Sequence, residues 1–245
     1  MPEIGVFTPD WPLPPGVHAA STTRLGGVSV GLYAGLNLGD HVGDEPRAVA
    51  ANRAALGRVL ELPAPPLWLS QVHGCRIAGP NDPPGINADA GYADRPGVVC
   101  AVLTADCLPV LLCSDDGREV AAVHCGWRGL AAGIVGHCVA RFAAAPGTLS
   151  AWLGPAIGPT AFEVGAEVRD AFTNGDSGAV AGFAAGDGGR WLADLFGLAR
   201  RALAAAGVQR VYGGGICTVA DPRRFYSYRR DGRTGRMASL IWRDA

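Results

Sequence analysis

The 245-residue sequence contains no lysine, since all 21 residues in its Lys+Arg count are arginines. This absence excludes a Schiff-base lysine and the lysine of a phosphate-binding Walker loop. Phosphate or carboxylate groups must therefore be recognised by arginine, by backbone amides or by a metal ion. Charge is scarce as well: charged residues make up 18% of the chain and the net charge is -1, so no overall field attracts nucleic acid or an anionic membrane.

The chain also lacks a secretion-signal pattern and a long uninterrupted apolar run. Residues 1–16 carry proline and acidic residues where a signal peptide needs a basic start. The longest apolar stretch, residues 98–113, is interrupted by Asp106 and Pro109 and is too short to span a bilayer. The seven cysteines are odd in number and lie in apolar stretches, which is typical of reduced thiols. We therefore expect a cytoplasmic protein with no membrane partner.

No repeat and no low-complexity linker divides the sequence, and its proline-rich pieces are short, which predicts a single domain over residues 1–245. Continuous β-prone runs predict strands buried on both faces at residues 98–103, 110–113 and 120–123. The turn at residues 114–117 joins the last two runs and indicates antiparallel pairing within a mixed sheet.

Helices are expected between these strands and after them. Apolar stripes and end signals place them over residues 48–60, 128–145 and 163–172, and from Asp194 to a stop at Gly207. Strands mixed with helices on this scale predict a layered α/β (α+β) fold, with mixed β-sheets and flanking helices.

Two histidines and a cysteine stand at expected strand ends: His73, Cys107 and His124. Such a set can hold zinc and leave its fourth position open, as catalytic zinc sites do. The spacing matches no zinc finger, so the histidines could equally be polar core residues and Cys107 a small buried hydrophobe. Alternatively, Cys107 could be a thiolate nucleophile with either histidine as its base. Metal analysis distinguishes these alternatives, because only the first requires about one zinc per chain.

Acidic and basic residues surround these positions. Asp106 interrupts an apolar strand, where a carboxylate is costly unless it is paired or acts on something. It could orient a ligand imidazole, or it could form an ion pair with Arg128. The segment from Gly126 to Arg128 at a helix start suits an anion. Asp106 is the first candidate for proton transfer and Glu163 is the second.

Seven segments resemble the YfiH family in the family's own order; they are residues 21–29, 36–39, 71–74, 103–109, 124–129, 153–158 and 227–231. Members of this group have been described as polyphenol oxidases or laccase-domain proteins, as purine nucleoside phosphorylases and as peptidoglycan editing factors. The resemblance covers nearly the whole chain. One departure is Cys125, where the family motif usually has alanine.

This resemblance implies a layered fold of mixed sheets and a metal, zinc with copper as a substitute, bound by His73, Cys107 and His124. It implies phosphorolysis of adenosine, inosine and methylthioadenosine, deamination of adenosine and a minor phenol oxidase activity. The alternative function is a peptidoglycan editing hydrolase acting on UDP-muramyl-amino acid precursors. Nucleoside and phosphate are then the expected partners of a monomer or weak homo-oligomer.

The histidine count ranks these activities. A multicopper oxidase needs many imidazoles for its blue-copper site and three-copper cluster, and often a thioether ligand. The chain has five histidines and two methionines, so it cannot ligate four coppers. Phenol oxidation is at most a side activity of a copper-loaded site.

Phosphorolysis requires a phosphate clamp and contacts to the nucleoside. Guanidinium groups can hold phosphate with two parallel hydrogen bonds, so we expect Arg24 and Arg128 to bind phosphate. Asn37 and Gln71 are expected to bind ribose hydroxyls or the purine edge. Cys107, Asp106 and Arg128 are the expected catalytic residues. Without a role in binding, Asn37 would cap a turn, and Arg24 and Arg128 would each form an ion pair on the surface.

Six arginines crowd residues 223–236, where they alternate with aromatic and acidic residues. Such mixtures occur in single-strand nucleic-acid binding. We favour the alternative of a C-terminal loop that is held by ion pairs and lines the pocket, and we expect no nucleic-acid partner.

Overall fold

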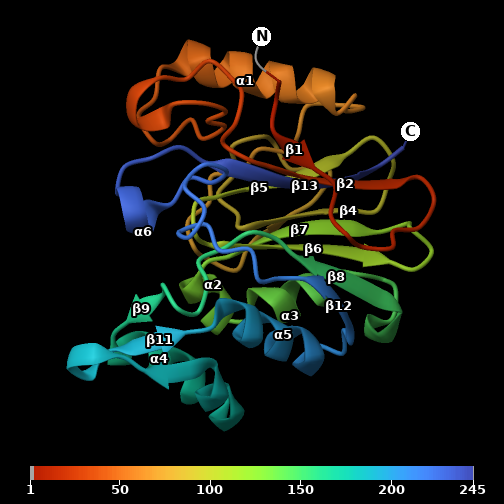
Figure 1. The fold of residues 1–245 in the computed structure, drawn as a ribbon. Helices are drawn as coiled ribbons and strands as arrows, with labels where there is room; N and C mark the ends of the chain where they lie inside the picture. Colours follow the sequence, from red (N-terminus) through yellow and green to blue (C-terminus); the bar gives the residue numbers. More distant parts are fainter. Residues whose placement is uncertain (1–2, 245) are drawn as a thin grey trace.

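The protein is described by a computed structural model that covers residues 3–244, and its centre consists of two sheets that face each other (Figure 1). The first is a 4-stranded antiparallel sheet in the order β1-β2-β13-β5. Its strands are β1 (Val6–Phe7), β2 (Val17–Thr22), β13 (Met237–Arg243) and β5 (Val99–Thr104). The C-terminal strand thus pairs in the middle of a sheet that begins at the N-terminus.

The second is a 6-stranded mixed sheet in the order β12-β8-β6-β7-β4-β3. β12 pairs with β8 in parallel and β3 pairs with β4 in parallel, whereas the other pairs are antiparallel. Its strands are β3 (Ile77–Ala78), β4 (Ala90–Ala93), β6 (Leu108–Ser114), β7 (Val120–Cys125), β8 (Leu149–Leu153) and β12 (Arg210–Gly213). All residues of β6, β7 and β8 are buried, because helices cover one face and the first sheet covers the other.

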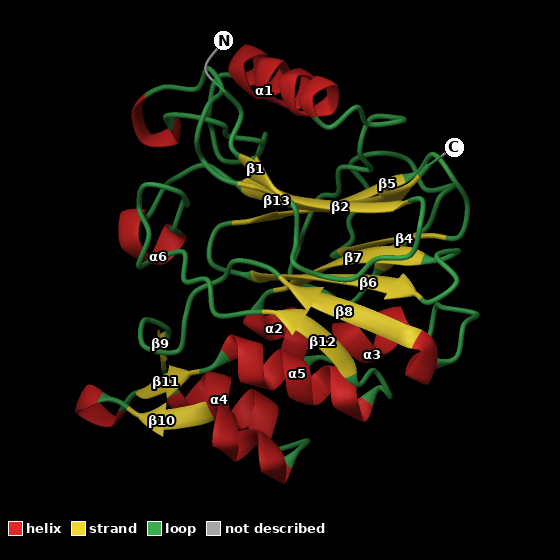
Figure 2. Cartoon of the chain, turned by 45° about the vertical axis from the view of Figure 1, so that its right-hand side comes forward, coloured by secondary structure: helices red, strands yellow, loops and turns green. Residues whose placement is uncertain are grey.

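Helices close the two outer faces (Figure 2). α1 (Pro46–Val59) covers the first sheet, and its buried residues pack with Leu36, Leu38 and Leu240. α2 (Trp127–Ala131), α3 (Ile134–Val139) and α5 (Leu195–Ala205) cover the second sheet and bury the largest apolar cluster against it. No helix in the described range 3–244 has the length and apolar character needed to cross a membrane.

A small outlying layer follows the second sheet. Here β9 (Glu163–Val164), β10 (Phe183–Ala185) and β11 (Trp191–Ala193) form a 3-stranded antiparallel sheet beside α4 (Ala166–Thr173). The last helix, α6 (Tyr228–Asp231), is one turn long and lies apart from these layers at the edge of both large sheets. Both segments matter for the site because they contribute residues to its cavity.

The layered mixed-sheet fold, the three predicted strands and the helix over residues 48–60 are confirmed. The helix predicted after Asp194 is also confirmed, and Gly207 follows it with a φ of 90°. The continuous helix predicted over residues 128–145 is wrong. Gly133 has a φ of 88°, which breaks it into α2 and α3. The helix predicted from residue 163 begins only at Ala166, because Glu163 and Val164 pair in β9.

Candidate functional site

The three metal-ligand candidates come together where the chain crosses between the two large sheets. β5 and β6 belong to different sheets, so the residues between them, 105–107, pass from one to the other. β6 then pairs with β7, which places His124 opposite Pro109 and close to Cys107. His73 approaches from the loop before β3. The ligand atoms of His73, Cys107 and His124 all lie within 4.8 Å of one another.

A buried carboxylate, Asp89, organises this cluster. Its Oδ1 lies 2.8 Å from Nδ1 of His124 and accepts the backbone N–H of His73 at 2.9 Å. Its Oδ2 accepts the N–H groups of Val72 and Gly74 at 3.1 and 2.7 Å. These bonds hold His73 at a φ of 60° and orient the His124 ring so that Nε2 is the nitrogen left for a metal. Asp89 was not among the site residues predicted from the sequence.

The electrostatics of the cluster follow from this arrangement. Burial acts against the charged form of His124, but the nearby Cys107 and Asp89 outweigh it and raise the pKa of His124 to about 9. Burial likewise opposes ionisation of Asp89, yet its hydrogen bonds from His124 and Gly74 keep its pKa below the ordinary value. Burial, followed by the charge of His124, lowers the pKa of His73. His73 is thus held in the neutral form that binds metals.

The donor set fits a zinc ion. Two imidazole nitrogens and one thiolate sulfur are ligands of catalytic zinc, and these three atoms lie within 4.8 Å of one another, close enough to converge on one ion. Gly126 leaves room for it: a Cβ at Gly126 would lie 2.5 Å from Nδ1 of His73 and 3.3 Å from Sγ of Cys107. His73, Cys107 and His124 are therefore the residues that would hold the metal.

Gly126→Ala provides a direct test of this packing. Gly126 has a φ of -63° and a ψ of 152°, which alanine adopts without strain, so its added methyl group acts on the ligands rather than on the backbone. We expect zinc affinity to fall about 10- to 100-fold, as when ligand orientation is disturbed. A competition titration against a chromogenic zinc chelator measures it. Gly136→Ala in α3, where a Cβ meets nothing within 4 Å, is the matched control and should bind zinc normally.

The cluster opens into a cavity of about 360 Å³. Its apolar and aromatic wall includes Leu103, Trp127, Ile157, Phe162, Leu195 and Tyr228, and its basic residues are His41, Arg128, Arg229 and Arg236. Gln71 and Asp106 also line it, together with the three ligand candidates. The cavity thus collects residues from both large sheets, from α2 and α6, and from the loop that leads to β9.

Asp106 lies in the cavity wall, and its carboxylate oxygens accept hydrogen bonds from the segments around α6. Its Oδ1 accepts the hydroxyl of Thr218 at 2.5 Å, and its Oδ2 accepts the Ser227 hydroxyl at 3.0 Å and the Arg229 backbone N–H at 2.6 Å. Within residues 3–244 it makes no ion pair with Arg128. The imidazole-orienting contact that we expected from Asp106 is made by Asp89 instead, because Asp106 holds the segment that carries α6.

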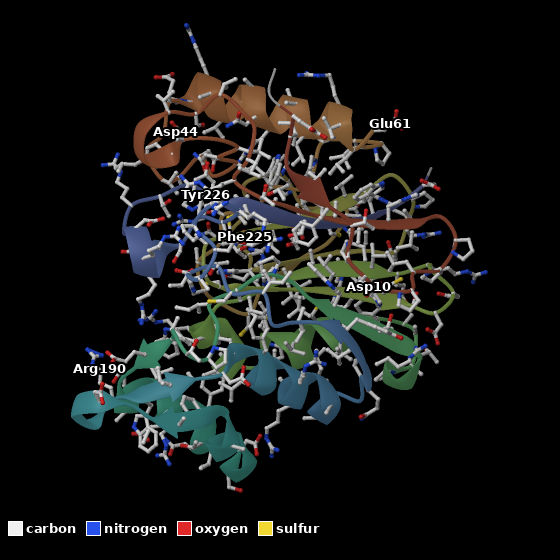
Figure 3. The ribbon with its side chains drawn as sticks, in the orientation of Figure 1. Asp10, Asp44, Glu61, Arg190, Phe225 and Tyr226 are labelled. Atoms are coloured by element: carbon white, nitrogen blue, oxygen red, sulfur yellow. The ribbon has the colours of Figure 1, made fainter. Side chains whose placement is uncertain are left out.

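Arg24 and Asn37 do not reach the cavity. The Arg24 guanidinium stacks over Tyr226 at 4.5 Å and donates to the Pro222 and Ala34 carbonyls. Tyr226 itself is fully buried on the α6 side of the molecule (Figure 3). Asn37 is also fully buried. Its amide oxygen accepts the backbone N–H groups of Gly39 and Arg236, and its NH₂ group donates to Asp44.

Two further candidates have defined places. Gln71 lines the cavity, but its side-chain amide exchanges two hydrogen bonds with the Leu103 backbone at 2.8 and 2.7 Å, which extends the edge of β5. Glu163 lies outside the lining and pairs with Arg190 at 3.2 Å. Arg128 does line the cavity, with its guanidinium 4.4 Å from the ring of Trp127.

The arginine-rich segment 223–236 behaves as the predicted loop. Arg224 pairs with Asp221 and Arg230 pairs with Asp231, each at 2.6 Å. Arg229 and Arg236 instead enter the cavity lining. We expected this segment to line the pocket, but no local feature of the sequence distinguishes these two arginines from the other four.

Comparisons with known proteins place the chain in a family. Residues 18–244 match the family described as "Multi-copper polyphenol oxidoreductase laccase". The purine nucleoside phosphorylase YfiH of Shigella flexneri is 54% identical over 239 residues, which cover 97% of this chain and 98% of that protein. A purine nucleoside phosphorylase of Pseudomonas aeruginosa is 52% identical over 237 residues, covering 96% and 97%.

Solved structures agree with these sequence matches. The crystal structure of a Neisseria meningitidis protein of family DUF152 superposes with a TM-score of 0.94 at 47% identity, covering 98% of this chain and 100% of that one. The crystal structure of a Bacillus licheniformis hypothetical protein YfiH superposes with a TM-score of 0.89 at 31% identity, covering 93% of each chain. This chain therefore belongs to the YfiH family, which carries the laccase-domain and DUF152 descriptions.

Proposed function

We propose that this protein is a zinc-dependent purine nucleoside phosphorylase that acts on adenosine, inosine and methylthioadenosine. The observation that carries the proposal is a single cavity in which the candidate zinc ligands, three arginines and an aromatic wall meet. Relatives that are 54% and 52% identical bear the name purine nucleoside phosphorylase, which supports the same reaction here.

The parts of the cavity match the parts of this reaction. The aromatic wall, with Phe162 and Tyr228, offers surfaces on which a flat purine can stack. The arginines hold phosphate beside the ribose, so that the attack occurs within one complex. A phosphate oxygen bonds to the ribose C1 while the bond from C1 to the base nitrogen breaks. The electron pair of that bond leaves with the base, whose nitrogen takes up the proton carried by the phosphate. Zinc bound by the three ligands would supply a Lewis acid here, and copper in its place would account for minor phenol oxidation.

We assign deamination of adenosine to the same cavity. This reaction replaces the purine amino group with an oxygen from water and requires a carboxylate that carries protons. Among the cavity-lining residues of the described chain, Asp106 is the one carboxylate, and its contact with the Thr218 hydroxyl offers a donor–acceptor pair. Proton transfer is therefore assigned to Asp106.

Product analysis of the zinc-loaded protein tests these assignments. With adenosine and phosphate we expect free adenine and ribose 1-phosphate, and without phosphate we expect inosine as the deamination product. Adenine formation that does not depend on phosphate would contradict phosphorolysis, and a lack of inosine in the phosphate-free reaction would contradict deamination. No turnover under any condition would instead favour the hydrolase acting on UDP-muramyl-amino acid precursors.

A further inference from the structure

We propose that Arg236 is the principal phosphate-binding residue of this cavity, with Arg229 beside it, and that Asn37 and Gly39 hold Arg236 in position. This inference rests on the phosphorylase function proposed above and assigns its anion subsite to residues that the sequence did not single out. The ligand is inorganic phosphate, the co-substrate of phosphorolysis.

Arg236 presents a preformed edge for an oxyanion. Its Nη1 donates to the carbonyls of Thr234 and Gly235 at 2.9 and 3.0 Å, which fixes the guanidinium plane. Its Nε and Nη2 have no hydrogen-bond partner within residues 3–244. Nε–H and Nη2–H form the parallel pair that matches two oxygens of a phosphate. Because one side of the guanidinium is already held by the protein, little side-chain entropy remains to be lost when phosphate binds.

The segment at residues 36–39, which carries one of the family motifs, fixes the base of the Arg236 side chain. Oδ1 of Asn37 accepts the backbone N–H of Arg236 at 2.9 Å, and the N–H of Leu38 donates to the Arg236 carbonyl at 3.1 Å. Gly39 provides the space for the side chain, since a Cβ at this position would lie 2.8 Å from Cγ of Arg236. Asn37 therefore acts through Arg236 rather than on the nucleoside.

Arg229 is fixed from two sides. Its backbone N–H donates to Asp106 and its Nη1 donates to the carbonyl of Glu163 at 2.8 Å, while the guanidinium lies 5.4 Å from the ring of Phe162. Its remaining N–H groups have no partner in the described part of the chain. The side chain thus spans from α6 to β9 across the cavity wall.

The charge balance of the cavity calls for an anion. Arg128, Arg229 and Arg236 line it, and none of them has a carboxylate within 4.0 Å among residues 3–244. Asp106 is the one acidic residue in the described lining, and two hydroxyls and a backbone N–H already occupy its oxygens. Arg236 is partly buried, whereas Arg128 and Arg229 are exposed, and this burial lowers the pKa of Arg236 although Cys107 and Asp106 oppose it. A desolvated guanidinium binds phosphate more strongly than an exposed one.

Phosphate binding to variants of the zinc-loaded protein tests the inference. In Arg236→Gln we expect the dissociation constant for inorganic phosphate, from equilibrium dialysis, to rise about 10- to 100-fold, the usual effect of losing a charged two-point contact. The KM for phosphate should rise in parallel and the KM for adenosine should stay within about twofold. Arg236→Lys keeps the positive charge but loses the two parallel N–H donors, so its dissociation constant for phosphate should lie between those of wild type and Arg236→Gln. Arg223→Gln, an exposed arginine of the same segment outside the cavity, is the control.

Gly39→Ala supplies a second variant that leaves the guanidinium present but displaced. Its expected result is a weaker phosphate affinity, whereas Gly57→Ala, in open space on α1, should leave the phosphate affinity unchanged. Unchanged phosphate affinity in Arg236→Gln, or a larger loss in Arg24→Gln, would overturn the inference. Because dialysis requires no turnover, a failure of the phosphorylase assignment alone would show as absent product with phosphate binding that still depends on Arg236.

Discussion

Cys107→Ala is expected to lose bound zinc and to lower turnover of adenosine about 10³-fold or more. The substitution removes one of three ligands, so the remaining two imidazoles cannot form a site of comparable affinity. A Lewis acid contributes several kcal/mol to transition-state stabilisation, and about 4 kcal/mol corresponds to a factor of about 10³ in rate. Inductively coupled plasma mass spectrometry of the purified variant, followed by steady-state kinetics, measures both effects.

Two controls separate the metal role of Cys107 from a nucleophilic one. Cys217→Ala removes a partly exposed thiol that lies against Gly158, outside the ligand cluster, and should keep full zinc content. Wild-type protein stripped of zinc by a chelator should be as inactive as Cys107→Ala and should recover when zinc is returned. If the stripped protein retained activity and lost it on thiol alkylation, Cys107 would be the nucleophile and not a ligand.

Local patterns indicated the three ligand candidates, and the family resemblance then favoured their role as metal ligands. His124 interrupts an apolar strand, and Asp106 next to Cys107 interrupts another apolar run, where a polar group is costly unless it is paired or functional. The structure confirms that His124 and Cys107 meet with His73. The same reasoning predicted β5, β6 and β7, because buried strands leave continuous apolar runs. The sequence gives no local sign that β5 and β6 belong to different sheets, because sheet membership depends on pairing between strands far apart in the chain.

Contacts between distant segments account for what the sequence did not predict. Ala88-Asp89-Ala90 shows an acid between small apolar residues, much as Asp106 does, yet nothing local indicates which histidine it faces. The sequence does not tell which arginines reach the cavity, because that depends on packing. The Arg24 side chain stacks over Tyr226, whereas Gly39 leaves space for the Arg236 side chain to reach the cavity. Asn37 was expected at the nucleoside because its amide is polar, although burial turns that amide toward the backbone of Arg236.

Asp89→Asn is the second large effect that we expect, and it acts on stability and metal affinity together. Asn keeps the shape, but its NH₂ group must replace one carboxylate oxygen. Placed at Oδ2 it would face the N–H groups of Val72 and Gly74, and placed at Oδ1 it would face the N–H of His73 and Nδ1 of His124. In both positions donors oppose donors in a fully buried site. Removing one partner of a buried charged pair costs about 3–5 kcal/mol of unfolding free energy.

Metal affinity distinguishes a positioning role of Asp89 from a merely structural one. Because Asp89 orients the His124 ring and the backbone of His73, zinc affinity of folded Asp89→Asn should fall about 10- to 100-fold. Glu119→Gln is the matched control: this buried carboxylate accepts the Tyr92 hydroxyl and the N–H groups of Ala143 and Ala144, and it takes no part in the ligand cluster. Both variants should unfold at lower urea concentration, and only Asp89→Asn should release zinc more readily to a competing chelator. Equal zinc affinity in the two variants would show that Asp89 stabilises the fold without positioning the ligands.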